Sequence, residues 1–260
     1  MTIPRIYCPD AVENKEICEL GPDNYKYLKQ VLRLKPGNKI NVFDGFGHEF
    51  AAVIKNFSSG RVCVELGKRI QAAGKEIRVS LAQAIPKANK MDLIVKSAAE
   101  LGADVIIPFT AERSISRIAG EKALLKIARW QKIAREAARC CRSSRITEIS
   151  SPLSFANMLS QASGKSYKII FWEEESQKSI KDALTDKKFN LMNDFFVIVG
   201  PEGGFSKDEV ILAKKAGFIS VSLGRQILKV ETAAAAIISI IQYEKGIFSN
   251  RLKEVKNAHL

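Results

Sequence analysis

The chain has few of the residues from which metal and disulfide sites are built. Its 260 residues include two histidines, His48 and His259, and five cysteines, with no Cys-x-x-Cys pair among them. A structural zinc site needs four suitably spaced ligands, so we expect no metal. An odd number of cysteines without a secretory leader is typical of proteins from a reducing compartment.

Long apolar runs are also missing. The longest, at 233–241, is interrupted by Ser239 and is too short to cross a bilayer. The first residues contain no apolar core of signal-peptide length. These absences predict a soluble, cytoplasmic protein that has no membrane partner.

Acidic residues are scarce relative to basic ones. The chain has 28 acidic and 41 basic side chains, giving a net charge of +13. Such an excess favours a polyanionic partner. The segment 113–145 holds ten of the basic residues and only two acids, Glu121 and Glu136. Within it Lys132, Arg135, Arg139 and Arg142 recur at intervals of three and four, with Trp130 on the other side. This spacing predicts a helix whose basic face contacts RNA phosphates; the alternative is a charged face that only meets solvent.

The usual nucleotide-binding loops are absent, because the chain has neither a Gly-Lys-Ser/Thr phosphate loop nor a Gly-x-Gly-x-x-Gly turn. Two other glycine loops are present, VGPEGGFS at 199–206 and LGRQILKVETAAAA at 223–236. Glu202 in the first loop would repel a pyrophosphate, but it suits a ligand with ribose hydroxyls or a positive centre. S-adenosylmethionine has both. The alternative is a strand-to-helix turn without a ligand.

The pattern of expected secondary structure changes near residue 72. Residues 1–72 alternate short strands and glycine turns, after a helix expected at 23–33 with Asp23 as its N-cap, and this favours a small β-barrel. A polar linker is expected at 71–76. From 77 onward strands and helices alternate, which predicts a mainly parallel sheet covered by helices. The expected strands are 39–44, 49–55, 61–70, 77–84, 105–109, 167–172, 195–199 and 218–222, and the expected helices of the second part are 87–101, 121–142, 152–161, 206–216 and 231–245. Ser206 and Glu209 form a capping-box pattern directly after the first glycine loop.

Several sequence blocks, in order along nearly the whole chain, resemble one family. They are LAQAIPKANKMDLIVKSAAELGA at 81–103, IIPFTAERS at 106–114, GPEGGFSKDE at 200–209 and LGxxILKxETA at 223–233. Together they resemble the RsmE-type family of SPOUT methyltransferases, which methylates N3 of a uridine in 16S ribosomal RNA. The resemblance implies an α/β fold, in which a trefoil-knotted SPOUT methyltransferase domain at 73–260 follows a PUA-like β-barrel RNA-binding domain at 1–72. The knot would lie at about 195–245.

The resemblance also implies S-adenosyl-L-methionine as the cofactor, 16S ribosomal RNA or the small ribosomal subunit as the partner, and a homodimer. The apolar side chains of the second loop would pack against the adenine. We expect the cofactor to contact Trp172, Gly200, Pro201, Glu202, Gly203, Gly204, Leu223, Gly224, Ile227 and Leu228. We expect RNA to contact Arg33, Lys87, Arg113, Arg117, Arg135, Arg139, Arg142 and Arg225.

Methylation at N3 needs a proton acceptor, or a cation that stabilises the anion forming on the uracil oxygens. Lys229 is the candidate cation and Glu231 the candidate base or orienting group, although Glu231 could equally cap the last helix. Lys229 stands where the family usually has arginine, which keeps the charge but loses the planar fork.

Two other functions remain open from the sequence. One is a SPOUT enzyme that acts on another RNA, such as tRNA. The other is a non-catalytic RNA-binding protein of ribosome assembly. Intact glycine loops favour an enzyme over the latter.

Overall fold

The structure, a computed structural model, describes residues 3–11, 15–70, 77–115, 118, 120–162, 164 and 166–249. The chain divides into two compact units. The first comprises Met1–Gly74 and Arg135–Ile146, and the second comprises Lys75–Ala134 and Thr147–Leu260. The linker expected at 71–76 and Arg117 lie outside the described residues.

The first unit is built on a five-stranded sheet with the order β1-β3-β4-β5-β2. Register shifts between Phe50 and Ala52 and between Ile54 and Asn56 interrupt the β4–β5 ladder, and such bulges bend a sheet. The three predicted strands are present, whereas the short strands β1 and β2 were not predicted. The strands are β1 (Arg5–Tyr7), β2 (Ile17–Leu20), β3 (Lys39–Phe43), β4 (Glu49–Ser58) and β5 (Arg61–Ile70).

The helix predicted at 23–33 is instead a short α1 (Pro22–Tyr25) that continues as a π-helix, η1 (Lys26–Val31). The N-cap is Gly21, so Asp23 was wrongly assigned. Pro22 accounts for the earlier start, because a proline in the first turn gives up an N–H that has no helical partner anyway. Leu32 N donates to Tyr27 O at 2.9 Å, an i to i+5 bond that a 3.6-residue pattern does not predict.

The second unit contains a parallel sheet with the order β12-β10-β11-β6-β7-β8, and β9 also pairs with β7. All residues of β6 after Arg78 are buried, as expected for a strand covered on both faces. The predicted mainly parallel sheet is confirmed. Its strands are β6 (Arg78–Ala84), β7 (Val105–Thr110), β8 (Glu148–Ile149), β9 (Leu153–Ser154), β10 (Tyr167–Phe171), β11 (Asp194–Val199) and β12 (Ile219–Val221).

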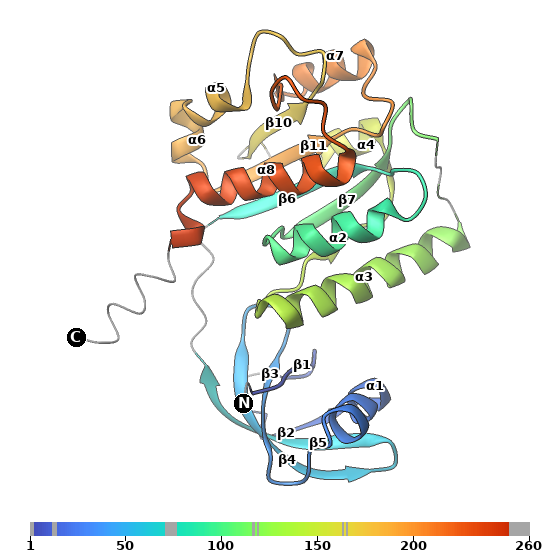
Figure 1. Cartoon of the computed structure of the whole chain (residues 1–260), viewed down its shortest axis with the longest axis vertical. Coiled ribbons are helices and arrows are strands. Elements are labelled where there is room, and N and C mark those ends of the chain that lie inside the picture. Colours follow the sequence, from blue (N-terminus) through green and yellow to red (C-terminus); the bar gives the residue numbers. More distant parts are fainter. Residues whose placement is uncertain are drawn as a thin grey trace, which may run out of the picture. The chain divides into compact units, whose positions relative to one another are not determined.

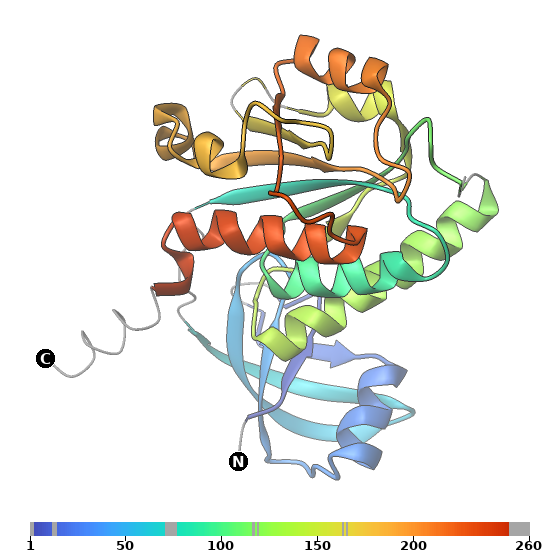
Figure 2. The same cartoon turned by 45° about the horizontal axis from the view of Figure 1, so that its top comes forward.

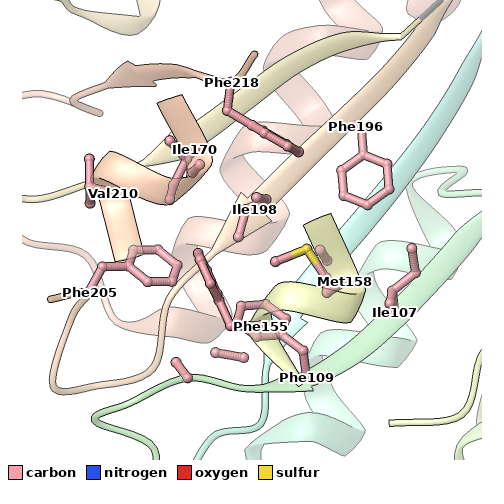
Figure 3. Close-up of a cluster of buried hydrophobic side chains, with 14 residues drawn as sticks. Ile107, Phe109, Phe155, Met158, Ile170, Phe196, Ile198, Phe205, Val210 and Phe218 are labelled. Carbon is pink, nitrogen blue, oxygen red and sulfur yellow. The ribbon is translucent and has the colours of Figure 1, made fainter. Parts of the chain in front are cut away.

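Helices pack on both faces of this sheet. Helices α2 and α8 lie side by side, and α8 also contacts β6 and β11 (Figures 1 and 2). On the other face, Phe155 and Met158 of α4 and Val210 of α7 join alternate strand residues such as Phe109 and Ile198 in one apolar cluster (Figure 3). The helices are α2 (Lys90–Glu100), α3 (Glu121–Cys141), α4 (Phe155–Ser160), α5 (Ile180–Leu184), α6 (Lys187–Leu191), α7 (Lys207–Lys215), α8 (Val230–Glu244) and the 3-10 turn η2 (Ile247–Ser249).

Helix α3 matches its predicted bounds to within one residue, and it belongs to both units. Trp130 is 3% exposed, so it packs into the protein, as its place opposite the basic face predicted. Arg142 lies just beyond the helix end in the left-handed region, at φ 63°. The prediction of a helix at 152–161 was partly wrong, since its first residues form β9 and Ser154 caps α4.

Candidate active site

Three loops of the second unit leave the sheet at the same edge. Phe171 at the end of β10 pairs in register with Val199 of β11 and with Val221 of β12. The next residues, Trp172, Gly200 and Ser222, therefore begin their loops side by side. Open parallel sheets bind their ligands at this carboxyl edge.

The loop at 200–204 runs from β11 to α7 in a fixed conformation. Gly204 is buried at φ 67°, and its N–H donates to Pro201 O at 3.0 Å. A Cβ at Gly204 would overlap the carboxylate of Glu173, and the positive φ itself favours glycine. Glu173 was not among the predicted site residues.

Helix α7 begins directly after this loop with the predicted capping box, which is confirmed. Glu209 N donates to Ser206 Oγ at 3.3 Å, and Ser206 N donates to Glu209 Oε2 at 3.0 Å. The buried Glu209 also accepts from Glu112 N at 2.9 Å. This carboxylate therefore links the glycine loop to the segment that follows β7.

Glu202, in the middle of the loop, is held by the first residue of α2 and by the segment just before that helix. Lys90 Nζ lies 2.8 Å from Glu202 Oε1, and Lys87 N donates to the same carboxylate at 3.2 Å. Burial acts to raise the pKa of Glu202, but these hydrogen bonds outweigh it and the net pKa is lowered. Lys90 was not among the predicted site residues. Its place on the first turn of α2 resembles that of any solvated lysine, so only tertiary structure reveals it.

The loop between β12 and α8 carries the second set of predicted residues. Ile227 is 85% exposed, and Leu223 and Leu228 are half-buried. Lys229 is the exposed N-cap residue of α8, and Glu231 lies in the first turn of that helix.

Two polar groups at this edge have no partner among the described residues. Glu231 Oε2 and Trp172 Nε1 are both buried without a hydrogen bond in the described part of the chain. Leaving such a group unsatisfied costs about 1–3 kcal/mol, so each is suited to a ligand. Glu231 also acts electrostatically on Lys90, which raises the pKa of that lysine, although the hydrogen bond from Lys90 to Glu202 contributes more.

These groups fit the cofactor expected from the sequence. An indole N–H donor, a carboxylate acceptor, a glycine loop that leaves no room for a Cβ and exposed apolar side chains match the acceptors, hydroxyls and flat purine of S-adenosylmethionine. The loops can hold such a molecule through Trp172, the glycine backbone and the apolar wall of the second loop. Within the described residues, no group of three or more metal-ligating side chains is present.

The basic RNA candidates fall into two groups. Arg113 donates to Gly203 O at 3.2 Å and Lys87 lies against Glu202, so both are at the glycine loop, and Arg225 is exposed in the second loop. Lys87, Arg113 and Arg225 all belong to the second unit.

The other candidates, Arg33, Arg135, Arg139 and Arg142, belong to the first unit. Arg139 bonds to Tyr27 Oη at 2.9 Å and to Glu136, and its guanidinium lies over the Tyr27 ring. Arg135 lies over the ring of Tyr7. The end of α3 is thus engaged with aromatic side chains of its own unit. Arg33 and Arg142 are exposed.

No described helix is both long and apolar enough to span a bilayer.

Models of two domains match the chain. An RNA methyltransferase domain matches residues 73–242, and an RNA methyltransferase PUA domain matches residues 20–67. The ribosomal RNA small subunit methyltransferase E of Buchnera aphidicola from Acyrthosiphon pisum is 30% identical over 248 residues, 95% of each chain. The enzyme of the same name from Bacillus subtilis is 27% identical, over 90% of this chain and 92% of its own.

Solved structures give the same result. A ribosomal RNA small subunit methyltransferase E from Neisseria gonorrhoeae, bound to S-adenosyl methionine, has a TM-score of 0.82 at 28% identity and covers 93% of this chain and 98% of its own. A methyltransferase from Legionella pneumophila in complex with the same cofactor has a TM-score of 0.82 at 30% identity, over 94% and 98%. The expected α/β methyltransferase fold with a PUA-like amino-terminal domain is confirmed. The chain belongs to the RNA methyltransferase family, in the group of the ribosomal RNA small subunit methyltransferases E.

Proposed function

We propose that the protein transfers a methyl group from S-adenosylmethionine to N3 of a uridine in 16S ribosomal RNA. One observation carries the proposal: two buried polar atoms have no partner in the described part of the chain, Trp172 Nε1 directly after β10 and Glu231 Oε2 in the first turn of α8. The two glycine loops begin at the same edge of the sheet as Trp172. Relatives named ribosomal RNA small subunit methyltransferase E, one solved with S-adenosyl methionine, support it.

When bound, S-adenosylmethionine supplies an electrophilic methyl group. The protein's own residues align the acceptor and manage its proton. Uracil N3 carries a proton and is a poor nucleophile until that proton leaves. Glu231 accepts it, and the ammonium of Lys229 stabilises the negative charge that forms on the uracil oxygens. Because N3 lies on the pairing edge, the target base must be unpaired or turned out of its helix.

Incubation with small ribosomal subunits tests this function directly. The purified protein and S-adenosylmethionine are added to 30S subunits from cells that lack the gene, and the nucleosides are analysed by mass spectrometry. We expect one N3-methyluridine per 16S RNA. A parallel reaction contains total tRNA in place of the subunits. Methylation of tRNA alone would move the assignment to a different RNA, methylation of another atom would change the acceptor, and no methylation of either RNA would contradict the proposal.

Replacement of Gly204 by alanine tests the cofactor loop. A side chain at this φ costs about 1–2 kcal/mol and must also displace Glu173. We expect the affinity for S-adenosylmethionine, measured by calorimetry, to fall at least about tenfold.

Gly217→Ala is the matched control for this variant. Gly217 has φ 87°, but no described atom lies within 4 Å of the added Cβ. It therefore reports backbone strain alone. Equal cofactor affinities in the two variants would argue against a role for the glycine loop.

Three further features belong to the proposal. Residues 195–245 form a trefoil knot, supported by the path from β12 at the sheet edge to α8, which contacts β6 and β11. The methyltransferase domain begins at residue 73, after a first domain at 1–72. The protein works in the cytoplasm.

We also propose a homodimer, which light scattering after gel filtration tests. Most of the apolar face of α8 is buried within the chain, including Ala234, Ile237 and Ile241, so this face packs in the core. Two other apolar side chains, Ile227 in the loop before α8 and Tyr243 in its last turn, are 85% and 70% exposed and are available to a second copy instead.

A further inference from the structure

A tight turn at 44–48 in the first unit presents one aromatic side chain to solvent. Phe46 at its tip is 69% exposed. Elsewhere in this unit Phe43 and Phe50 are buried, as apolar rings in a small domain usually are. Phe46 therefore contributes little to the hydrophobic core, and its ring is available to a ligand.

The turn is rigid, so the exposed ring is held in place. Asp44 is buried, and its Oδ1 accepts from Phe46 N at 2.7 Å and from His48 N at 3.0 Å. Its Oδ2 lies 2.6 Å from His48 Nδ1. Gly45 and Gly47 take φ values of 86° and 112°, which favour glycine.

The same turn is hydrogen-bonded to the segment after α3. Ile146 N donates to Gly45 O at 2.9 Å, and Gly47 N donates to Ser144 O at 3.0 Å. Both segments belong to the first unit. A ring on so fixed a turn loses little conformational entropy when a ligand stacks on it.

A guanidinium lies beside this turn. Arg145 is exposed, and its Cζ and Nη2 lie 3.1 and 3.2 Å from the position that a Cβ would take on Gly47. The backbone of Arg145 is fixed by Ser143, whose Oγ accepts from Arg145 N at 3.1 Å and donates to Arg145 O at 2.7 Å. An exposed ring and a cation are thus presented together by neighbouring turns.

We propose that Phe46 and Arg145 bind an unpaired nucleotide of RNA, with its base stacked on the Phe46 ring and its phosphate at the Arg145 guanidinium. Stacking of a base on an aromatic side chain contributes about 1–3 kcal/mol without reading the sequence. Arginine bonds phosphate oxygens with two N–H groups. The net charge of +13 favours an RNA occupant over an apolar protein surface.

This inference rests on the proposed function for the identity of the RNA, but its site is separate from the residues proposed for methyl transfer. The bound nucleotide is a contact that anchors the substrate, so it affects binding and not the chemical step.

Direct RNA binding by Phe46→Ala, Phe46→Trp and Arg145→Gln tests the proposal. The probe is a single-stranded oligonucleotide of uridines with one 2-aminopurine, whose fluorescence is quenched by stacking. We expect Phe46→Ala to weaken binding about 5- to 100-fold and to lose the quench, and Phe46→Trp to retain both. Arg145→Gln should reduce the slope of log affinity against log salt by about 1.

Val31→Ala is the control, because Val31 is an equally exposed apolar residue of the same unit, at 66%. It should bind the oligonucleotide like the unchanged protein. The affinity for S-adenosylmethionine should be unchanged in all four variants, which separates this test from a failure of the cofactor site. If Phe46→Ala binds RNA with full affinity, the inference is wrong. Loss of binding to a protein partner, with RNA binding intact, would assign the turn to a protein interface instead and also overturn it.

Discussion

Glu231→Gln will reduce the turnover of uridine methylation by a factor of about 100 or more while the protein becomes no less stable. Glutamine keeps the size of glutamate but cannot accept a proton, and general acid–base catalysis contributes about 10²- to 10⁴-fold. The buried Oε2 of Glu231 has no hydrogen-bond partner in the described part of the chain. The substitution therefore breaks no hydrogen bond of Oε2, and we expect the melting temperature to be no lower.

The two readouts of this variant are independent. Turnover is measured with 30S subunits at saturating cofactor, and stability is measured as the melting temperature. Glu244→Gln, at the exposed other end of α8, is the control and should change neither. Turnover within threefold of the unchanged protein would show that Glu231 is not the proton acceptor. Lys229→Ala tests the second proposed catalytic residue, the cation that stabilises charge on the uracil oxygens. Unchanged turnover with normal RNA binding would exclude Lys229 from this role.

Local sequence patterns predicted the elements around the site well. The bounds of β5 and the alternation of strands and helices could be predicted from the periodicity of apolar residues. The capping box could be predicted from Ser206 and the glutamate three residues later. These features depend on neighbours along the chain. The glycine loops could be placed at strand ends for the same reason.

Contacts between distant segments could not be predicted in this way. Lys90 reaches Glu202 across 112 residues, and Glu173 lies against Gly204 only because β10 and β11 pair in register. The π-helical turn after Tyr25 likewise differs from the repeat on which the helix prediction relied. A single sequence carries no signal for any of the three.

Arg5→Met will destabilise the first unit by about 3–5 kcal/mol. Arg5 and Glu49 form an ion pair at 2.6 Å with side-chain exposures of only 7% and 10%. Arg5 also donates to the carbonyl oxygens of Ala138 and Ser143, at the carboxyl end of α3, where a cation is favourable. Removing one partner of a buried pair leaves the other charge uncompensated, and this accounts for the size of the effect.

Arg61→Met is the matched control in the same unit. Arg61 and Glu19 form an ion pair at 2.7 Å, but their side chains are 59% and 57% exposed. Such a surface pair contributes at most about 1 kcal/mol. Equal urea midpoints for the Arg5 and Arg61 variants would show that burial of the first pair has no energetic consequence.

The pH dependence of the same pair gives a second test. Burial acts to raise the pKa of Glu49, but hydrogen bonds from Arg5 and Ser144 outweigh it, and the net pKa is lowered below its ordinary value of 4.5. A carboxyl whose pKa is lower in the folded state stabilises the fold above its unfolded pKa, and this stabilisation is lost as the pH falls through the folded pKa. The melting temperature should therefore fall below about pH 4.5 more steeply in the unchanged protein than in Arg5→Met, where the lowering of the Glu49 pKa is largely removed. If the melting temperatures of the two proteins depend on pH in the same way across this range, Arg5 does not set the ionisation of Glu49. The stability lost in Arg5→Met would then come from the hydrogen bonds of Arg5 to the carbonyl groups at the end of α3.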